Sequence, residues 1–104
     1  MASAWITEYA SFGIRRDTGT GTLQAQMPLE PGTDQTPVTF TAAAQSAAFA
    51  ASTRFVRIIT DADCHVLFGA NPTATASHQK LIAGVEYWRA VSAGDKVSIY
   101  DGTS

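Results

Sequence analysis

The sequence predicts an all-β domain, either an antiparallel β-sandwich or a small jelly-roll-like barrel with long polar loops. Short runs rich in β-branched and aromatic residues recur along the chain and are separated by clusters of Gly, Pro, Asn and Asp. No strand pattern alternates with an amphipathic helix pattern, as a parallel α/β sheet would require. At 104 residues the chain is long enough for one modest core, so we expect a single β domain over residues 1–104.

The first predicted strand covers residues 4–9, AWITEY, whose Trp, Ile, Thr and Tyr favour a pleated conformation. Successive strand residues point to opposite faces. The alternation therefore places Trp5, Thr7 and Tyr9 on one side and Ile6 and Glu8 on the other.

Residues 11–37 are predicted to form a flexible loop or arm region. The first part, SFGIRRDTGTGT, is rich in Gly and Thr and is expected to be a mobile connector. Residues 22–27 favour a short strand, whereas the following PLEPGTDQTP contains three prolines and cannot be a central strand or a helix. An extended arm across a neighbouring subunit and a plain surface loop both fit this stretch.

A half-buried strand is predicted over residues 38–42, VTFTA, where apolar and Thr residues alternate. The alanine-rich residues 42–51 are ambiguous. Alanine has the highest helix propensity, but no capping sequence precedes the segment and its flanks favour strands. We therefore expect irregular or strand-like structure here, with a short helix as the alternative.

Residues 54–60, RFVRIIT, have apolar side chains on both faces and predict a central strand. The DAD sequence at 61–63 is expected to form a tight turn because Asp bonds readily to its own backbone. Residues 64–69 are then expected to return as the second arm of a hairpin. Their buried face is predicted to consist of Cys64, Val66 and Phe68.

A loop with an Asn-Pro start follows, and a β pattern resumes over residues 85–91. Residues 92–95, SAGD, predict a turn that closes a final hairpin, with Gly94 available for a positive φ. The last strand, KVSIY at 96–100, is expected to turn Val97 and Ile99 inward. Ser98 and Tyr100 are expected to point outward.

The charge pattern argues against two classes of partner. The net charge is −2 and Arg15-Arg16 is the only basic doublet, so the Lys/Arg cluster that neutralises phosphates is missing and no nucleic-acid binding is expected. No run approaches the ~20 apolar residues that span a bilayer, and the N-terminal residues do not resemble a signal peptide, so no membrane association is expected. We expect a soluble intracellular product, unless it is exported inside an assembly.

Few groups in the sequence are suited to chemistry. Cys64 and His65 lie on adjacent strand positions and point to opposite faces, so they cannot bind one metal ion or act as a nucleophile–base pair. A pairing of Cys64 with His78 stays open, since His78 lies in a distant loop. The single cysteine allows no intrachain disulfide. We predict no catalytic residues, no metal, no cofactor and no enzymatic activity.

The aromatic residues are the candidates for binding a partner. Trp and Tyr are common anchors of subunit interfaces. The candidate interface residues are Trp5, Tyr9, Trp88 and Tyr100. For Trp88 three roles stay open, namely a core position, a subunit contact and a stacking platform for a sugar.

Several motifs occur together over nearly the whole chain: EPGTDQTPVTF, TRFVRIITDADCHVLFGANPTATASHQKLIAG and EYWRAVSAGDKVSIY. In this combination the chain resembles a group of small structural proteins from the virions of tailed bacteriophages. The matching motifs are strand and turn features rather than catalytic ones. The resemblance therefore bears more directly on a shared fold than on a shared role.

The resemblance implies a structural virion protein that is made in the host cytoplasm and located in the virion. The leading expectation is a capsid decoration (cement) protein that binds the major capsid protein lattice, with dimers or trimers of the chain expected because closed symmetry is common in oligomers. Such a protein binds in many copies, so each contact can be weak. The alternatives are a head–tail connector, tail or head-fibre component, and a carbohydrate-binding surface module.

Overall fold

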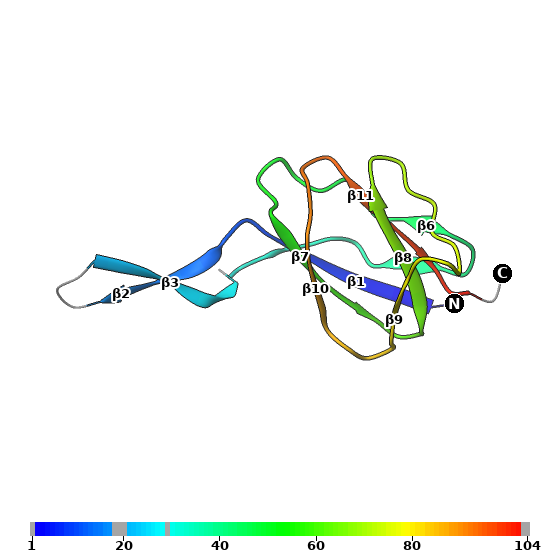
Figure 1. The fold of residues 1–104 in the computed structure, drawn as a ribbon, viewed down its shortest axis with the longest axis horizontal. Coiled ribbons are helices and arrows are strands. Elements are labelled where there is room, and N and C mark those ends of the chain that lie inside the picture. The colour runs from blue at the N-terminus through cyan, green and yellow to red at the C-terminus, as the bar shows by residue number, and fades with distance from the viewer. Residues whose placement is uncertain (1, 18–20, 29, 103–104) are drawn as a thin grey trace.

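The computed structural model describes residues 2–17, 21–28 and 30–102, which form eleven strands and no helix (Figure 1). The predicted fold class is confirmed, since two antiparallel sheets pack face to face as a β-sandwich. The front sheet has the order β10-β7-β1-β4, with β5 also paired to β1. The back sheet has the order β6-β11-β8-β9, and β2 and β3 form a separate two-stranded ribbon.

The front sheet consists of β10 (Tyr87–Ala90), β7 (Phe55–Thr60), β1 (Ala2–Tyr9), β4 (Thr33–Asp34) and β5 (Val38–Phe40). The back sheet consists of β6 (Ala44–Gln45), β11 (Lys96–Tyr100), β8 (Cys64–Gly69) and β9 (Gln79–Leu81). The ribbon consists of β2 (Phe12–Asp17) and β3 (Gly21–Pro28).

The core lies between the two sheets and follows the predicted alternation. Ile6 and Ile58 from the front sheet and Ile99 from the back sheet are almost completely buried. The predicted inward positions of β8 and β11 are also confirmed for Cys64, Val66 and Val97. The complete buried cluster is Ala4, Ile6, Phe40, Phe49, Val56, Ile58, Cys64, Val66, Leu81, Val97 and Ile99.

The hairpin predicted around residues 61–63 is wrong. β7 belongs to the front sheet and β8 to the back sheet, so the turn carries the chain across the sandwich. Within this turn the Thr60 hydroxyl donates to the carbonyl of Ala62 at 2.9 Å. The predicted hairpin through 92–95 is wrong for the same reason, since β10 pairs with β7 and β11 pairs with β8 and β6. An alternating pattern fixes which face of a strand is buried, but not whether the next strand lies beside it or opposite it.

The alanine-rich residues 42–51 contain only the short strand β6 and are otherwise irregular, as expected. Their backbone is held by β11 and by the residue that precedes it. The amide of Ser46 donates to the carbonyl of Val97 at 2.8 Å, and the amide of Phe49 donates to that of Asp95 at 2.8 Å. These bonds place Phe49 in the core, and the burial of its side chain stabilises a segment that has little regular secondary structure.

Residues 70–78 form a strap that lies over part of the outer face of the back sheet, at β11 and β6. The amide of Ala74 donates to the Ser98 hydroxyl at 2.9 Å, and the side-chain amide of Gln45 donates to the carbonyl of Pro72 at 2.8 Å. Ser98 points outward, as expected from the alternation with the core residues Val97 and Ile99, but it is fully buried because the strap lies over it.

The region 11–37 is more regular than the predicted loop. Residues 12–17 form β2, which pairs antiparallel with β3, and the strand expected over 22–27 is confirmed. The composition did not reveal β2, because Gly and Arg interrupt its β pattern. The strand forms nevertheless, since β3 supplies its backbone hydrogen bonds. The flexibility expected of this region stays a prediction.

The ribbon projects from one end of the sandwich (Figure 1). It gives the molecule extents of 57 × 26 × 23 Å and a Cα radius of gyration of 15.3 Å. A compact domain of this length would have a radius of gyration of about 13 Å. The difference reflects the ribbon, which extends away from the two packed sheets.

The two described ends of the chain meet at the opposite end of the sandwich (Figure 1). Ala2 pairs with Phe40. The amide of Asp101 donates to the carbonyl of Thr41, the residue that follows Phe40, at 3.3 Å. The ends are therefore held by consecutive residues of one segment. Across the described residues, no helix has the length and apolar character needed to cross a membrane.

Candidate interaction face

The outer face of the front sheet carries most of the residues predicted to bind a partner. Because side chains alternate along a strand, the residues between the core positions of β1, β7 and β10 share this face. The pairing register places Trp5 beside Ile59, Thr7 beside Arg57, and Arg57 beside Trp88. We call this surface the front face; it comprises Trp5, Thr7, Tyr9, Phe55, Arg57, Ile59, Trp88 and Ala90.

Two tryptophans are exposed on the front face. Trp5 is 47% exposed and Trp88 is 38% exposed, although large aromatic side chains are usually well covered. They lie on β1 and β10, which flank β7, so their strands are about 10 Å apart at the usual strand spacing. Half-exposed tryptophans on one open sheet face are typical of a binding surface.

Trp88 is held in a defined orientation. Its indole nitrogen donates to Glu86 Oε1 at 2.9 Å, and the other oxygen of Glu86 forms an ion pair with Arg57 Nη1 at 3.5 Å. The indole also packs against the rings of Tyr9 and Phe55, with centroid distances of 5.6 and 6.0 Å. The exposed part of the indole is therefore preorganised, which lowers the entropy lost when a partner binds.

Tyr9 supports the front face but offers little contact surface itself. It is only 2% exposed and stacks on Phe55 with a centroid distance of 5.4 Å. Its hydroxyl donates to Glu30 Oε2 at 2.9 Å, and burial together with this bond raises the pKa of the phenol. Gly32 lies against the ring, where a Cβ would approach Tyr9 Cε1 to 2.7 Å, so only glycine fits there without displacing the ring.

Tyr100 does not join this group. It lies on β11 in the back sheet, where it pairs with His65 and is partly buried. The structure thus brings together three of the four predicted residues and separates the fourth. Phe55 and Arg57 belong to the front face and were not predicted as interface residues, although the alternation over 54–60 places them on one side with Ile59.

Two further exposed aliphatic residues lie in the loop between β9 and β10. Ile82 and Val85 are 45% and 44% exposed, and the amide of Val85 donates to the carbonyl of Ile82 at 3.3 Å. The amide of Gly84 donates to the carbonyl of Thr60 at 2.8 Å, which fixes this loop beside the end of β7. The sequence pattern did not single out these residues, because an apolar residue in a short loop resembles the end of a strand.

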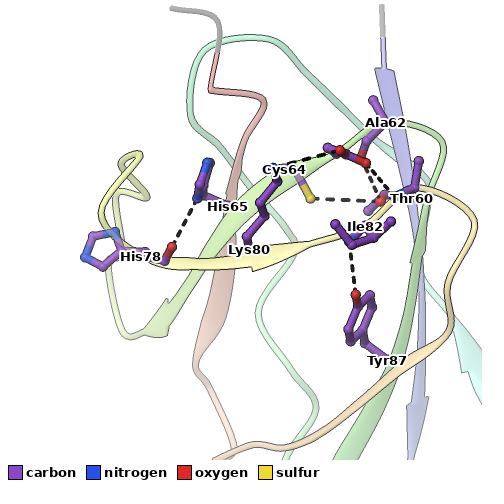
Figure 2. A network of polar contacts seen from close by, with 10 residues as sticks. Thr60, Ala62, Cys64, His65, His78, Lys80, Ile82 and Tyr87 are labelled. Atoms are coloured by element: carbon purple, nitrogen blue, oxygen red, sulfur yellow. Dashed lines mark hydrogen bonds and ion pairs between the residues drawn. The ribbon is translucent and has the colours of Figure 1, made fainter.

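The cysteine and the histidines lie on opposite sides of β8 (Figure 2). Cys64 points into the core, where its thiol donates to Thr60 Oγ1 at 3.9 Å, while His65 Nδ1 lies 3.0 Å from the carbonyl of His78 on the other side. His78 in turn accepts a hydrogen bond from the amide of Thr75. The opposite orientations expected for Cys64 and His65 are confirmed, and no Cys64–His78 pair forms.

These residues do not assemble a reactive centre. Burial raises the pKa of the Cys64 thiol, so the thiol is kept in its less nucleophilic protonated form. No group of three or more His, Cys, Asp or Glu side chains within the described part of the chain is arranged to hold a metal ion.

One carboxylate is buried on the core side of the front sheet. Glu8 is 7% exposed and accepts three hydrogen bonds: from Thr53 Oγ1 at 2.6 Å, from the amide of Ala50 at 2.9 Å and from the side-chain amide of Gln35 at 2.9 Å. Burial opposes ionisation, but the three donors outweigh it and lower the pKa of this carboxyl group. Glu8 therefore anchors the irregular segment after β6 to the front sheet.

Comparisons with protein-family models, with curated protein sequences and with solved structures give no match to this chain.

Proposed function

We propose that the protein is a structural component of a virion, a capsid decoration protein that docks on the major capsid protein lattice through its front face. The observation that carries this proposal is the pair of half-exposed tryptophans, Trp5 and Trp88, on one open sheet face. Tryptophan and arginine are the residues most enriched at the energetic centres of protein interfaces. Arg57 is the direct strand partner of Trp88, and Ile59, two residues further along β7, is that of Trp5.

A comparison of the two outer faces of the sandwich also favours docking through the front face. The strap at 70–78 covers the part of the outer face of the back sheet around Ser98, which it buries. The front face carries the most exposed aromatic side chains of the described residues. A charged fraction of only 15% also lowers the cost of removing water from the surface. Many such contacts on a repeating lattice bind strongly even where each is weak.

The test is binding of the purified protein to particles that lack it, measured by co-sedimentation. We expect Trp5→Ser and Trp88→Ser to weaken binding at least tenfold each, since interface anchors of this kind contribute about 2 kcal/mol. Tyr100→Ser is the matched control, because Tyr100 lies on the other sheet. Equal binding by the tryptophan variants and the wild type would exclude docking through the front face.

The same preparation locates the protein in the particle. A decoration protein is present in many copies per virion, whereas a head–tail connector, tail or head-fibre component is present in few. Counting copies in purified virions by quantitative gel or mass spectrometry separates these positions, and absence from purified virions rules out all of them.

A carbohydrate-binding surface module is the second candidate. The observation that favours it is the fixed indole of Trp88 beside the Glu86–Arg57 ion pair, because sugars stack on aromatic rings and bond to neighbouring polar groups. Glycan-array binding that is lost in Trp88→Ala, with the fold intact by circular dichroism, would support this candidate. Glycan binding without particle binding would replace the first proposal.

A further inference from the structure

The long strand β3 has an edge that no other strand covers. Among the described residues, β3 pairs with β2 and with no third strand. A two-stranded ribbon is marginally stable in water without further packing, and an open strand edge presents unpaired backbone donors and acceptors. The ribbon therefore has a structural reason to acquire another strand.

The sequences of the two ribbon strands differ in how they protect their edges. β2 (FGIRRD) contains three charged residues in six, which is a common protection against pairing with other chains. β3 (GTLQAQMP) contains none in eight, and its only proline is the last residue. Of the two edges, that of β3 is the one suited to strand addition.

We propose that β3 pairs antiparallel with β3 of a second copy of this chain, forming a four-stranded sheet of the order β2-β3-β3-β2 across a two-fold axis. Two features favour a second copy as the occupant. An uncharged strand meets no like-charge repulsion when it pairs with itself. Antiparallel pairing of identical strands also closes under two-fold symmetry, so the contact forms a dimer and does not extend into a fibre.

The shape of the molecule permits this pairing. The ribbon projects beyond the sandwich, along the 57 Å axis of the molecule (Figure 1). When two ribbons lie antiparallel, the two sandwiches lie at opposite ends of the dimer and do not collide. The front face takes no part in this contact, so the inference is independent of the proposed function and each can fail separately.

The test is the solution mass of the full-length protein over a concentration series, by analytical ultracentrifugation. We expect the wild type to form a dimer of twice 11.0 kDa. Ala25→Lys, in the middle of β3, brings two like charges together near the axis and should raise the dimer dissociation constant at least tenfold. Ala51→Lys, at an exposed turn of the sandwich, is the matched control and should leave the mass unchanged.

A second variant keeps the inference testable even if the lysine disturbs folding. Ala25→Cys should form an intermolecular disulfide under mild oxidation, because native Cys64 is buried and does not compete. Ala51→Cys should not form one. A wild type that is monomeric throughout overturns the proposal, as does a dimer whose stability is unaffected by Ala25→Lys. If the backbone amides of β3 are protected from hydrogen exchange only when the protein is bound to particles, the edge of β3 binds a capsid protein instead. That result would also overturn the proposal.

Discussion

Glu8 shows how a single buried side chain connects distant parts of this fold. Its position on the core side of β1 could be predicted, because it alternates with Tyr9 along a strand of known period. Its three donors could not, because they come from residues 35, 50 and 53, which the fold rather than the local sequence brings together. An acidic residue at a core position indicates that hydrogen-bond donors are needed nearby, but it does not identify them.

Replacing Glu8 with glutamine tests this network. The variant turns one acceptor into a donor that faces other donors, so we expect about 2 kcal/mol lower free energy of unfolding at neutral pH. Because the folded pKa of Glu8 is lowered, its contribution is present above the unfolded pKa near 4.5 and is lost as the pH falls through the folded value.

Denaturant unfolding at a series of pH values from neutral to acid measures both effects. The difference between the wild type and Glu8→Gln should shrink as the pH falls through the folded pKa. A constant difference across this range would show that the charge of Glu8 does not stabilise the fold.

At the scale of the elements, most strands could be predicted and their partners could not. The strands over 4–9, 38–40, 55–60, 64–69 and 96–100 occur close to where the patterns place them. The turns at 61–63 and 92–95 were predicted to close hairpins, yet both cross between the sheets. Alternation shows which face of each strand is buried. That face is buried whether the next strand in sequence lies beside it in the same sheet or opposite it in the other sheet, so the pattern does not determine the pairing.

Ser98→Ala tests the strap over the back sheet. The substitution removes the acceptor of the Ala74 amide and leaves that buried donor without a partner. We expect faster hydrogen exchange at the amide of Ala74 and about 1–2 kcal/mol lower stability. Exchange at the amide of Ser46, which bonds to the carbonyl of Val97, serves as the internal reference. Unchanged protection at Ala74 would mean that packing alone holds the strap.

At the scale of the whole molecule, the pairing of distant strands dominates the architecture. The first strand, β1, pairs with β7, and the last strand, β11, pairs with β6 and β8. Each of these pairings closes a long loop of chain. The conformational entropy of that loop is lost before the contacts between the paired strands can compensate for it. The composition indicated an all-β domain, but the order of strands within each sheet depends on these long-range contacts.

This topology predicts slow folding for a domain of this size. Sandwiches dominated by non-local pairing fold in roughly milliseconds to seconds, whereas helical bundles fold in microseconds to milliseconds. Stopped-flow refolding monitored by tryptophan fluorescence measures the rate, since Trp5 and Trp88 both lie on the front sheet. A Trp5→Phe variant identifies which indole reports the signal. Refolding that is complete well within a millisecond would contradict the prediction.

The meeting of the two described ends has a consequence for how the chain can be rearranged. Ala2 and Asp101 are bound to neighbouring residues, Phe40 and Thr41, at the end of the sandwich opposite the ribbon. A short peptide linker could therefore join the ends, and the chain could be reopened at the exposed turn at 51–52 without altering a strand. Such a circular permutant would preserve every strand pairing while presenting its new ends at a different place on the sandwich.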